Sequence, residues 1–256
     1  EPELIFSIQM HANVLMLLIN RFFFRKKLKI ICCERLSSKS YLKNLKGYLI
    51  LILAKILYQD AKKIICNSKE LCYEIKDLCK SNNITYIYNP TLNKNYKKLS
   101  KQHTKFSKAF LSNKKKIISM EIFREIKKKL VLLKAVNLCK NKKNLNVILI
   151  GQGKKKAELI DFSKKINFRS NFLIYDFKKN PFPYLFKSDL LVLTSNFEGM
   201  PNILIEAMVL NKSIISTNCP TGPKEILLNG KAGFLIKKND YKNLAKKIDL
   251  LFDNPS

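Results

Sequence analysis

Two glutamates, Glu198 and Glu206, lie in the stretch SNFEGMPNILIEAM, which spans residues 195–208. Glu198 follows an apolar run, and Glu206 lies one turn into a predicted helix that begins near Asn202. The N–H groups and positive dipole end at such a helix start suit a diphosphate. A carboxylate one turn later can accept hydrogen bonds from the vicinal hydroxyls of a ribose, and Glu198 would lie near a group beyond the phosphates. Spacing alone fits a capping acid and a solvated helix glutamate equally well.

A second candidate anion site, Gly151-Gln152-Gly153, follows the apolar run NVILI and opens a predicted helix. Glycine at both positions lets the backbone approach an anion at a helix N-terminus. Lys156 replaces the third glycine of a dinucleotide fingerprint, so a tight strand-to-helix turn is the preferred interpretation and a Rossmann cofactor site is the alternative. A further loop, TNCPTGPKEI (217–226), contains two prolines and a glycine, which restrict its backbone. Rigid loops at strand ends often shape ligand pockets.

The elements that must position these residues alternate between short β-rich runs and helical patterns. Nearly all-apolar strands between helices indicate parallel sheets covered by helices on both faces. Helices are expected between most strands, including one at 41–58 and one that follows Asp240 as its N-cap. Strands are predicted at 3–8, 29–33, 62–66, 85–88, 116–120, 146–150, 171–175, 189–195, 213–217 and 233–236.

A region rich in Lys, Asn and Ser interrupts this alternation, and residues 101–115 are predicted to be a linker. The predicted fold class is therefore α/β, with two Rossmann-like, doubly wound parallel-sheet domains at residues 1–100 and 116–256. The chain begins at Glu1 and its first domain has few strands, so we interpret it as a fragment with an incomplete first domain. Ligands bind such sheets outside the carboxyl ends of the strands, and often between domains.

The chain of 256 residues has a formal net charge of +30, from 49 basic and 19 acidic residues. A surface of this charge attracts polyanions such as nucleic acid, anionic lipid or phosphorylated ligands. Only five of the basic residues are arginines, and the aromatic residues fall mostly in apolar runs, which disfavours specific nucleic-acid recognition. An AT-rich genome would produce the same excess of Lys, Asn and Ile without a functional cause.

Seven cysteines without a C-x-x-C pair, and only His11 and His103, give no sign of a disulfide framework or a zinc site. We expect reduced thiols in a cytoplasmic compartment. No apolar run reaches about 18 residues, so a membrane-spanning helix is not predicted. The segments 12–24 and 41–58 are interpreted as buried helices, with a basic amphipathic helix on an anionic membrane as the alternative.

Residues 189–236 resemble the donor-binding half of GT-B glycosyltransferases of the retaining E-x7-E group, which are similar to glycosyltransferase family 4 and build polysaccharides and lipopolysaccharides. Glu198-x7-Glu206 is followed at family spacing by CPTGPKEIL and GFLI. The resemblance implies two domains facing a cleft, with family elements before Glu1 and after Ser256. It covers nearly the whole chain through FSIQMHANVL (6–15), IICNS (64–68), IYNP (87–90), IGQGKKKAEL (150–159) and NPFPYLFKSDLLVLTS (180–195).

The resemblance implies a role for each matching residue. Glu206 would bind the ribose of a nucleotide sugar, and Glu198 would hold the transferred sugar. Lys127 would offset the charge of the leaving diphosphate, and His11 is the candidate histidine on the acceptor side. No essential metal or cofactor is implied, because a basic pair and the helix dipole stabilise the diphosphate. The rest of the donor pocket would come from Gly199, Met200, Pro201, Asn202 and Gly151.

The chain departs from the family's G-R-L-x-x-x-K segment at residues 121–127. Lys127 matches the family lysine, but Glu121 stands at the glycine and Ile122 at the arginine. Arg124, displaced by two residues, is the candidate substitute for that arginine. Loss of one donor to a developing phosphate oxyanion can cost roughly 10²–10³ in rate. Glu121 near a diphosphate would add repulsion.

The resemblance predicts a hexosyltransferase-type enzyme that moves a sugar from a nucleotide-diphosphate sugar, most often a UDP-sugar in this branch, to a glycan or lipid-linked acceptor. The reaction would serve cell-surface polysaccharide synthesis with retained anomeric configuration, in the cytoplasm or peripherally on the inner face of the cell membrane. Glu121 and Ile122 favour an alternative, a weakened or inactive relative that only binds nucleotide sugar or membrane. A nucleic-acid-binding protein is a third hypothesis, which the arginine-poor composition disfavours.

Overall fold

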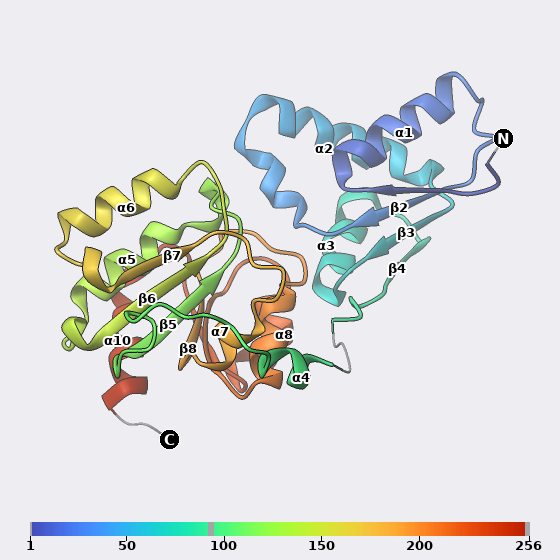
Figure 1. Ribbon diagram of the computed structural model, residues 1–256. Helices are drawn as coiled ribbons and strands as arrows, with labels where there is room; N and C mark the ends of the chain where they lie inside the picture. The colour runs from blue at the N-terminus through green and yellow to red at the C-terminus, as the bar shows by residue number, and fades with distance from the viewer. Residues whose placement is uncertain (1, 92–94, 254–256) are drawn as a thin grey trace. The chain divides into compact units, whose positions relative to one another are not determined.

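The computed structural model describes residues 2–91 and 95–253 (Figure 1). Residues 1, 92–94 and 254–256, which fall within the predicted domain ranges, lie outside the described part. The chain forms two compact units. The first contains Glu1–Asn89, Phe197–Pro201 and Pro220–Glu225, and the second contains Pro90–Asn196, Asn202–Cys219 and Ile226–Ser256.

The first unit is built on a four-stranded parallel sheet in the order β1-β2-β3-β4. Each strand overlaps one of the predicted apolar runs, so the predicted alternation of strands and helices is confirmed here. The strands are β1 (Ile5–Ile8), β2 (Ile30–Glu34), β3 (Lys63–Cys66) and β4 (Ile84–Tyr86). The helices between them are α1 (Met10–Phe22), α2 (Leu45–Leu57) and α3 (Lys69–Cys79), with the 3-10 turns η1 (Ser38–Lys43) and η2 (Tyr58–Asp60).

Helix caps and an apolar core explain why these residues form these elements. The side chain of Asn44 accepts a hydrogen bond from the Gly47 N–H at 2.8 Å, and Ser68 accepts one from the Leu71 N–H at 3.2 Å. Both bonds satisfy N–H groups that a helix start leaves without an intrahelical acceptor. The core of this unit includes Met10, Leu17, Ile30, Tyr58, Ile64 and Leu71.

The second unit is built on a six-stranded parallel sheet in the order β10-β9-β8-β5-β6-β7. Its strands are β5 (Lys115–Met120), β6 (Leu145–Ile150), β7 (Phe172–Tyr175), β8 (Leu190–Leu193), β9 (Ser213–Thr217) and β10 (Phe234–Ile236). Its helices are α4 (Tyr96–Ser100), α5 (Lys129–Leu138), α6 (Lys156–Lys165), α7 (Phe182–Phe186), α8 (Asn202–Val209), α9 (Pro223–Ile226) and α10 (Tyr241–Asp253). Short 3-10 turns η3 (Glu125–Lys127), η4 (Lys142–Asn144), η5 (Arg169–Asn171) and η6 (Leu228–Gly230) join them.

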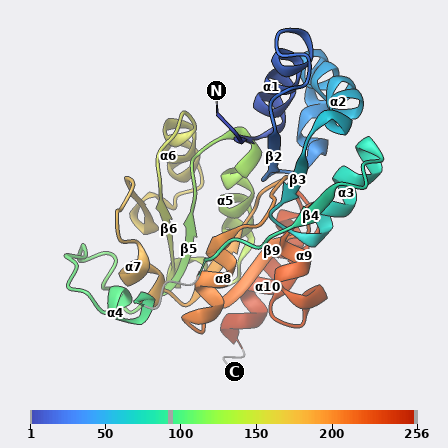
Figure 2. The same cartoon turned by 90° about the vertical axis from the view of Figure 1, so that its right-hand side faces the viewer.

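This sheet is doubly wound, as predicted. The chain runs from β5 through β6 to β7, returns to β8 on the other side of β5, and continues outward to β10. Right-handed connections therefore place α5 and α6 on one face and α8 on the other (Figures 1 and 2). The order of strands reverses between β5 and β8, and such a switch point leaves a crevice at the carboxyl ends of the strands.

The predicted helix after Asp240 is confirmed as α10, and Asp240 Oδ1 accepts a hydrogen bond from the Asn243 N–H at 3.0 Å. Its apolar stripe packs on the same core as β5 and β6 through Leu244, Ala245 and Ile248. The core residues of β6 and β8 are buried along the whole length of both strands. Strands buried in this way fit the continuous apolar runs of the sequence.

The predicted linker at 101–115 has a packed aromatic part. The Phe110 side chain is buried, and its ring stacks on Phe106 at a centroid distance of 4.6 Å. Phe110 also meets the ring of Tyr184 edge-on at 5.4 Å. Asn146 Nδ2, at the start of β6, donates to the Ala109 carbonyl at 2.8 Å, so this segment is held on the second unit.

Candidate functional site

A cavity of about 440 Å³ lies within the second unit, at the carboxyl ends of β5, β6 and β7. The end of β5 contributes Glu121 and Ile122, the end of β6 contributes Gly151, and the segment after β7 contributes Lys178. Glu206 of α8 also lines the cavity. The cavity therefore occupies the edge of the sheet at which doubly wound folds bind ligands, and two of its lining groups are carboxylates.

Glu206 is half-buried and is the fifth residue of α8, whose buried face carries Leu204 and Ala207. Burial raises the pKa of the Glu206 carboxyl above its ordinary value. A carboxylate that has lost part of its water gains from ligand hydroxyls that donate hydrogen bonds to it. Its position suits the recognition of a diol.

The glycines of the Gly151-Gln152-Gly153 turn are required by the approach of another backbone segment. A Cβ on Gly151 would lie 2.1 Å from the Glu121 carbonyl oxygen, and a Cβ on Gly153 would lie 2.5 Å from the Phe123 carbonyl oxygen. The segment after β5 is hydrogen-bonded to this turn, with the Phe123 N–H 2.9 Å from the Gln152 carbonyl. The close approach of the two strand-end loops explains both glycines, and it places Gly151 on the wall of the cavity.

Glu121 is the centre of a buried cluster of charges. Its side chain is 7% exposed, its Oε1 lies 2.7 Å from Lys127 Nζ, and its Oε2 bonds to Lys129 Nζ. Ser195 Oγ, just beyond β8, donates to Glu121 Oε1 at 3.1 Å. Burial alone would raise the pKa of Glu121, but the ammonium groups of Lys129 and Lys127 lower it to about 2. Glu121 is therefore ionised at neutral pH.

Lys129 is nearly inaccessible, since its side chain is 2% exposed. Its Nζ donates to Ser119 Oγ at 2.7 Å, and Ser119 Oγ donates in turn to the Val192 carbonyl at 2.7 Å. The cluster thus joins the carboxyl ends of β5 and β8, the two strands that flank the switch point. A buried charge needs partners of this kind, because an unpaired ammonium ion in the core would be strongly unfavourable.

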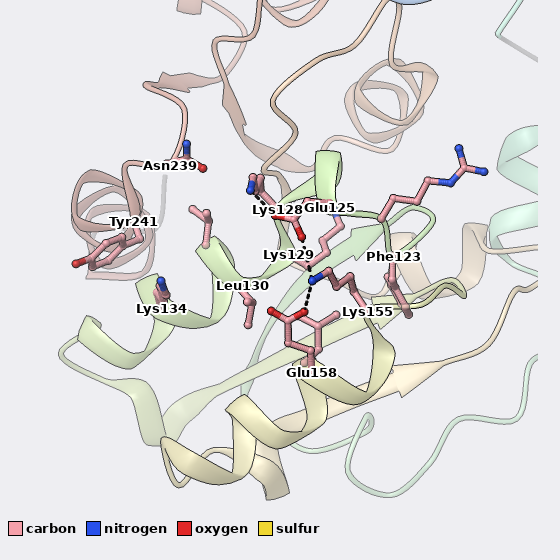
Figure 3. Close-up of a pocket in the computed structure, with 13 residues that line it drawn as sticks. Phe123, Glu125, Lys128, Lys129, Leu130, Lys134, Lys155, Glu158, Asn239 and Tyr241 are labelled. Atoms are coloured by element: carbon pink, nitrogen blue, oxygen red, sulfur yellow. Dashed lines mark hydrogen bonds and ion pairs between the residues drawn. The ribbon is translucent and has the colours of Figure 1, made fainter. Parts of the chain in front are cut away.

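Arg124, the candidate substitute for the missing arginine, is exposed and lines a different cavity of about 310 Å³. Figure 3 shows this second cavity, where Lys155 lies between two carboxylates. Its Nζ is 3.1 Å from Glu125 Oε2 and 2.6 Å from Glu158 Oε2. Glu206 and Gly151 therefore share one cavity, whereas Arg124 lines the other.

The turn that carries Glu198 is held by the loop at 220–225. The Glu198 carbonyl accepts a hydrogen bond from Thr221 Oγ1 at 2.5 Å. A Cβ on Gly222 would lie 2.3 Å from the Gly199 carbonyl and 2.8 Å from Pro201 Cδ, so this loop and the turn are in close contact. Glu198 is 8% exposed, Met200 is partly exposed, and Asn202 is the first residue of α8.

His11 lies in the first turn of α1 and is exposed. Its Nδ1 is 3.2 Å from the hydroxyl of Tyr41, a residue of η1. Asn13, also in α1, contacts the buried carboxyl group of Glu34 at the end of β2, and Asn13 Nδ2 donates to Glu34 Oε1 at 2.7 Å. Burial raises the pKa of Glu34 to about 7.

Sequence reasoning missed Lys129, Ser195 and Lys178. Lys129 belongs to the run KKK at 127–129, in which composition gives no means of telling a buried lysine from two more accessible ones. Ser195 ends the apolar run before the Glu198 turn, and this place at a strand end was the only signal for it. Lys178 follows β7 in another lysine-rich stretch.

Comparison with known proteins gives a family match for the second part of the chain. Residues 100–256 match the family described as glycosyl transferases group 1. An uncharacterised glycosyltransferase of Methanocaldococcus jannaschii is 29% identical over 247 residues, which cover 89% of this chain and 58% of that protein. CapM, a capsular polysaccharide biosynthesis glycosyltransferase of Staphylococcus aureus, is 27% identical over 84% of this chain and 58% of its own length. The chain therefore spans less than two thirds of these curated relatives.

Solved structures show the same fold. HepE of Anabaena, solved in complex with UDP, matches with a TM-score of 0.76 and 18% identity over 98% of this chain and 69% of its own. Sucrose-phosphate synthase of Thermosynechococcus elongatus matches with a TM-score of 0.78 and 13% identity, over 99% of this chain and 65% of its own. The predicted GT-B fold is confirmed by these likenesses and by the two parallel sheets. The family match covers more than half of the chain, so this protein belongs to the glycosyl transferases group 1 family.

Proposed function

We propose that this protein transfers a sugar from a UDP-sugar to a glycan or lipid-linked acceptor in cell-surface polysaccharide synthesis, with retention of anomeric configuration. The observation that carries the proposal is the cavity at the carboxyl ends of β5, β6 and β7, which is lined by both Glu206 and Gly151. CapM is named for capsular polysaccharide biosynthesis, and HepE was solved with UDP and with UDP-glucose. The name of CapM supports a role in polysaccharide synthesis, and the complexes of HepE support a UDP-sugar donor.

In this proposal Glu206 accepts hydrogen bonds from the ribose hydroxyls. Gly151 contributes the wall of the same cavity at the end of β6. Glu198 holds the transferred sugar, and Gly199, Met200, Pro201 and Asn202 surround the sugar and the diphosphate. The eight-residue helix α8 begins at Asn202, so its first N–H groups and its dipole favour negative charge there.

The chemical step requires stabilisation of the diphosphate as it leaves the sugar. We assign this role to Lys127 and the helix dipole, which need no metal ion. His11 is assigned to the acceptor side, where the Tyr41 hydroxyl orients its ring. Arg124 remains a candidate for the second cation. Its exposure and its place in the other cavity make it a weaker one than sequence reasoning suggested.

Turnover separates this function from the alternative, a relative that binds nucleotide sugar without transferring it. The chain is incubated with radiolabelled UDP-sugars and a lipid extract that contains polyprenyl-linked acceptors. We expect label to move to the acceptor as UDP is released, and Glu206→Ala to abolish the transfer. Saturable UDP binding without consumption of any UDP-sugar would instead support the inactive alternative.

We also propose that the first unit lies on an anionic membrane surface. None of the helices in the described part of the chain has the length and apolar character to cross a bilayer. Along α2, however, a stripe of exposed apolar side chains recurs at helical spacing: Leu45, Leu49, Ile52 and Ile56. Lys46 and Lys55 on the same helix are exposed and basic. An apolar stripe flanked by lysines is the composition of helices that lie in a lipid interface.

A further inference from the structure

Two of the side chains that line the cavity of Glu206 are large, apolar and exposed. Phe177, in the segment after β7, is 72% exposed, and Ile122, just after β5, is 49% exposed. An exposed apolar side chain in a concave site gains free energy when a ligand covers it and removes it from water. Phe177 offers a flat ring, and the faces of such rings pack well against other flat rings.

The loop that carries Phe177 is anchored on both sides of that residue. Before it, the Asp176 carboxylate lies 2.6 Å from Lys156 Nζ at the start of α6. After it, Asn180 Nδ2 donates to the Leu99 carbonyl at 2.9 Å. The ring is therefore presented by a backbone that is already ordered, which reduces the entropy lost when a ligand binds.

The strand order places Phe177 and Glu206 on different sides of the cavity. β7 forms one edge of the sheet, whereas Glu206 belongs to α8, which follows β8. The ends of β5 and β6 lie between β8 and β7. A nucleoside has the same division, because its ribose carries a diol at one end and its base is a flat ring at the other.

Two backbone groups on the wall between these residues already have partners. The Gly151 N–H donates to the Tyr175 carbonyl at 2.9 Å, and the Gln152 carbonyl accepts from the Phe123 N–H at 2.9 Å. Neither group is needed by a ligand for its own satisfaction. Contact with the face of a ring is therefore the larger source of affinity on this side of the cavity.

We propose that Phe177 stacks on the base of the donor nucleotide and sets the affinity for that nucleotide. This inference rests on the proposed function, because it assumes that Glu206 binds the ribose of a nucleotide in the same cavity. Every base has a face that can stack, so Phe177 contributes affinity without selecting uracil.

A fluorescent reporter tests the contact directly. The chain contains no tryptophan, so Phe177→Trp introduces a single indole into the cavity. We expect UDP to lower its emission in a saturable way, because the base stacks on the indole. Ribose 5-phosphate and pyrophosphate have no base and should leave the emission unchanged. Phe186→Trp, which places the indole on α7 at a residue that is 40% exposed and does not line this cavity, is the control.

Calorimetric titration with UDP measures the contribution of the ring to affinity. We expect Phe177→Ala to weaken UDP binding on the order of tenfold, the usual effect of removing an aromatic ring from a stacked base. Phe177→Tyr keeps a ring and should stay within about threefold of the wild type, as should the control Phe186→Ala. Thermal unfolding confirms that each variant is folded.

Equal UDP affinity in the wild type and Phe177→Ala would overturn the inference. So would emission from Phe177→Trp that does not respond to bound UDP, or that responds equally to ribose 5-phosphate. In each case, UDP binding that is lost in Glu206→Ala would leave the proposed function standing. A wild type that does not bind UDP would overturn the proposed function and this inference together.

Discussion

Lys127 Nζ lies 2.7 Å from Glu121 Oε1, so the lysine that matches the family pattern is paired with the residue that departs from it most. The contact joins the 3-10 turn η3 to the segment just after β5. Lys127 is anchored further by its own carbonyl, which accepts a hydrogen bond from Thr194 Oγ1 at 2.8 Å. The cation is therefore placed at the switch point of the sheet before any ligand arrives, and such preorganisation favours stabilisation of a developing charge.

Replacement of Lys127 is expected to slow sugar transfer more than replacement of Arg124. Lys127→Met removes the cation that is paired with Glu121 of the cavity wall, and it should lower kcat/KM for the UDP-sugar by roughly 10²–10³. Arg124→Met removes an exposed charge that lines another cavity, and its effect should stay within about threefold. Steady-state kinetics of both variants provide the comparison.

Thermal unfolding of the two variants is the control. Lys127→Met should keep its fold, because Glu121 keeps Lys129 as a partner when Lys127 is lost. Both variants should unfold cooperatively near the wild-type temperature. A larger loss of rate in Arg124→Met than in Lys127→Met would show that Arg124 holds the diphosphate.

The stability of the first unit should fall as the pH rises from about 4.5 to 7. Burial raises the pKa of Glu34 from 4.5 to about 7, so in this range the folded state keeps a proton that the unfolded state has lost. The folded state binds more protons, and the free energy of unfolding therefore decreases with pH by roughly 3 kcal/mol in total. Urea titrations at several pH values measure this slope.

Glu34→Gln should flatten most of that dependence, since a glutamine keeps the hydrogen bond from Asn13 but does not titrate. Glu70, in the same unit, also has a raised pKa and contributes the same sign, so a smaller slope remains. Glu121 belongs to the second unit, and its pKa, lowered to about 2, contributes a slope of the opposite sign that lies mainly below about pH 5. An unchanged slope in Glu34→Gln would contradict the assignment.

Gly151→Ala should destabilise the second unit by about 1–3 kcal/mol. The new Cβ would lie 2.1 Å from the Glu121 carbonyl oxygen, a backbone atom that cannot turn away. The neighbouring Gln152→Ala truncates an exposed side chain and is the matched control. Urea unfolding of the two variants should differ clearly, and equal stability would show that the two loops do not meet as described.

Leu49→Glu should weaken binding to vesicles of phosphatidylglycerol about tenfold, because it places a carboxylate in the apolar stripe of α2. Leu49 is 55% exposed, so the substitution should leave the fold intact. Leu138→Glu, on α5 of the second unit, changes a leucine of similar exposure, 50%, and is the control. Vesicle co-sedimentation that falls equally in both variants would count against docking through α2.

The strands could be predicted from sequence because each is a short apolar run between helical patterns, and the parallel sheets bury such runs on both sides. β6 is the clearest case, with every residue of Leu145–Ile150 buried. The aromatic packing of Phe106 and Phe110 could not be predicted, because these residues stand alone in a polar stretch whose partner, Tyr184, lies far along the chain.

The site was only partly accessible to sequence reasoning. Glu206 and Gly151 were found from motif spacing, and the structure places both on one cavity. The pairing of charges around Glu121 could not be predicted from motif spacing, because it depends on which of three consecutive lysines is buried. Asn211, just after α8, has a φ of 53°, a left-handed conformation that asparagine tolerates better than most residues.

The central claim is that the cavity beside Glu206 binds the nucleotide of a sugar donor, and calorimetric titration of UDP into the wild type and Glu206→Ala tests it most directly. We predict a micromolar dissociation constant for the wild type and a loss of at least tenfold in Glu206→Ala, because a ribose diol would lose its carboxylate acceptor. Equal affinity in the two proteins, or no heat of binding in the wild type, would contradict the account.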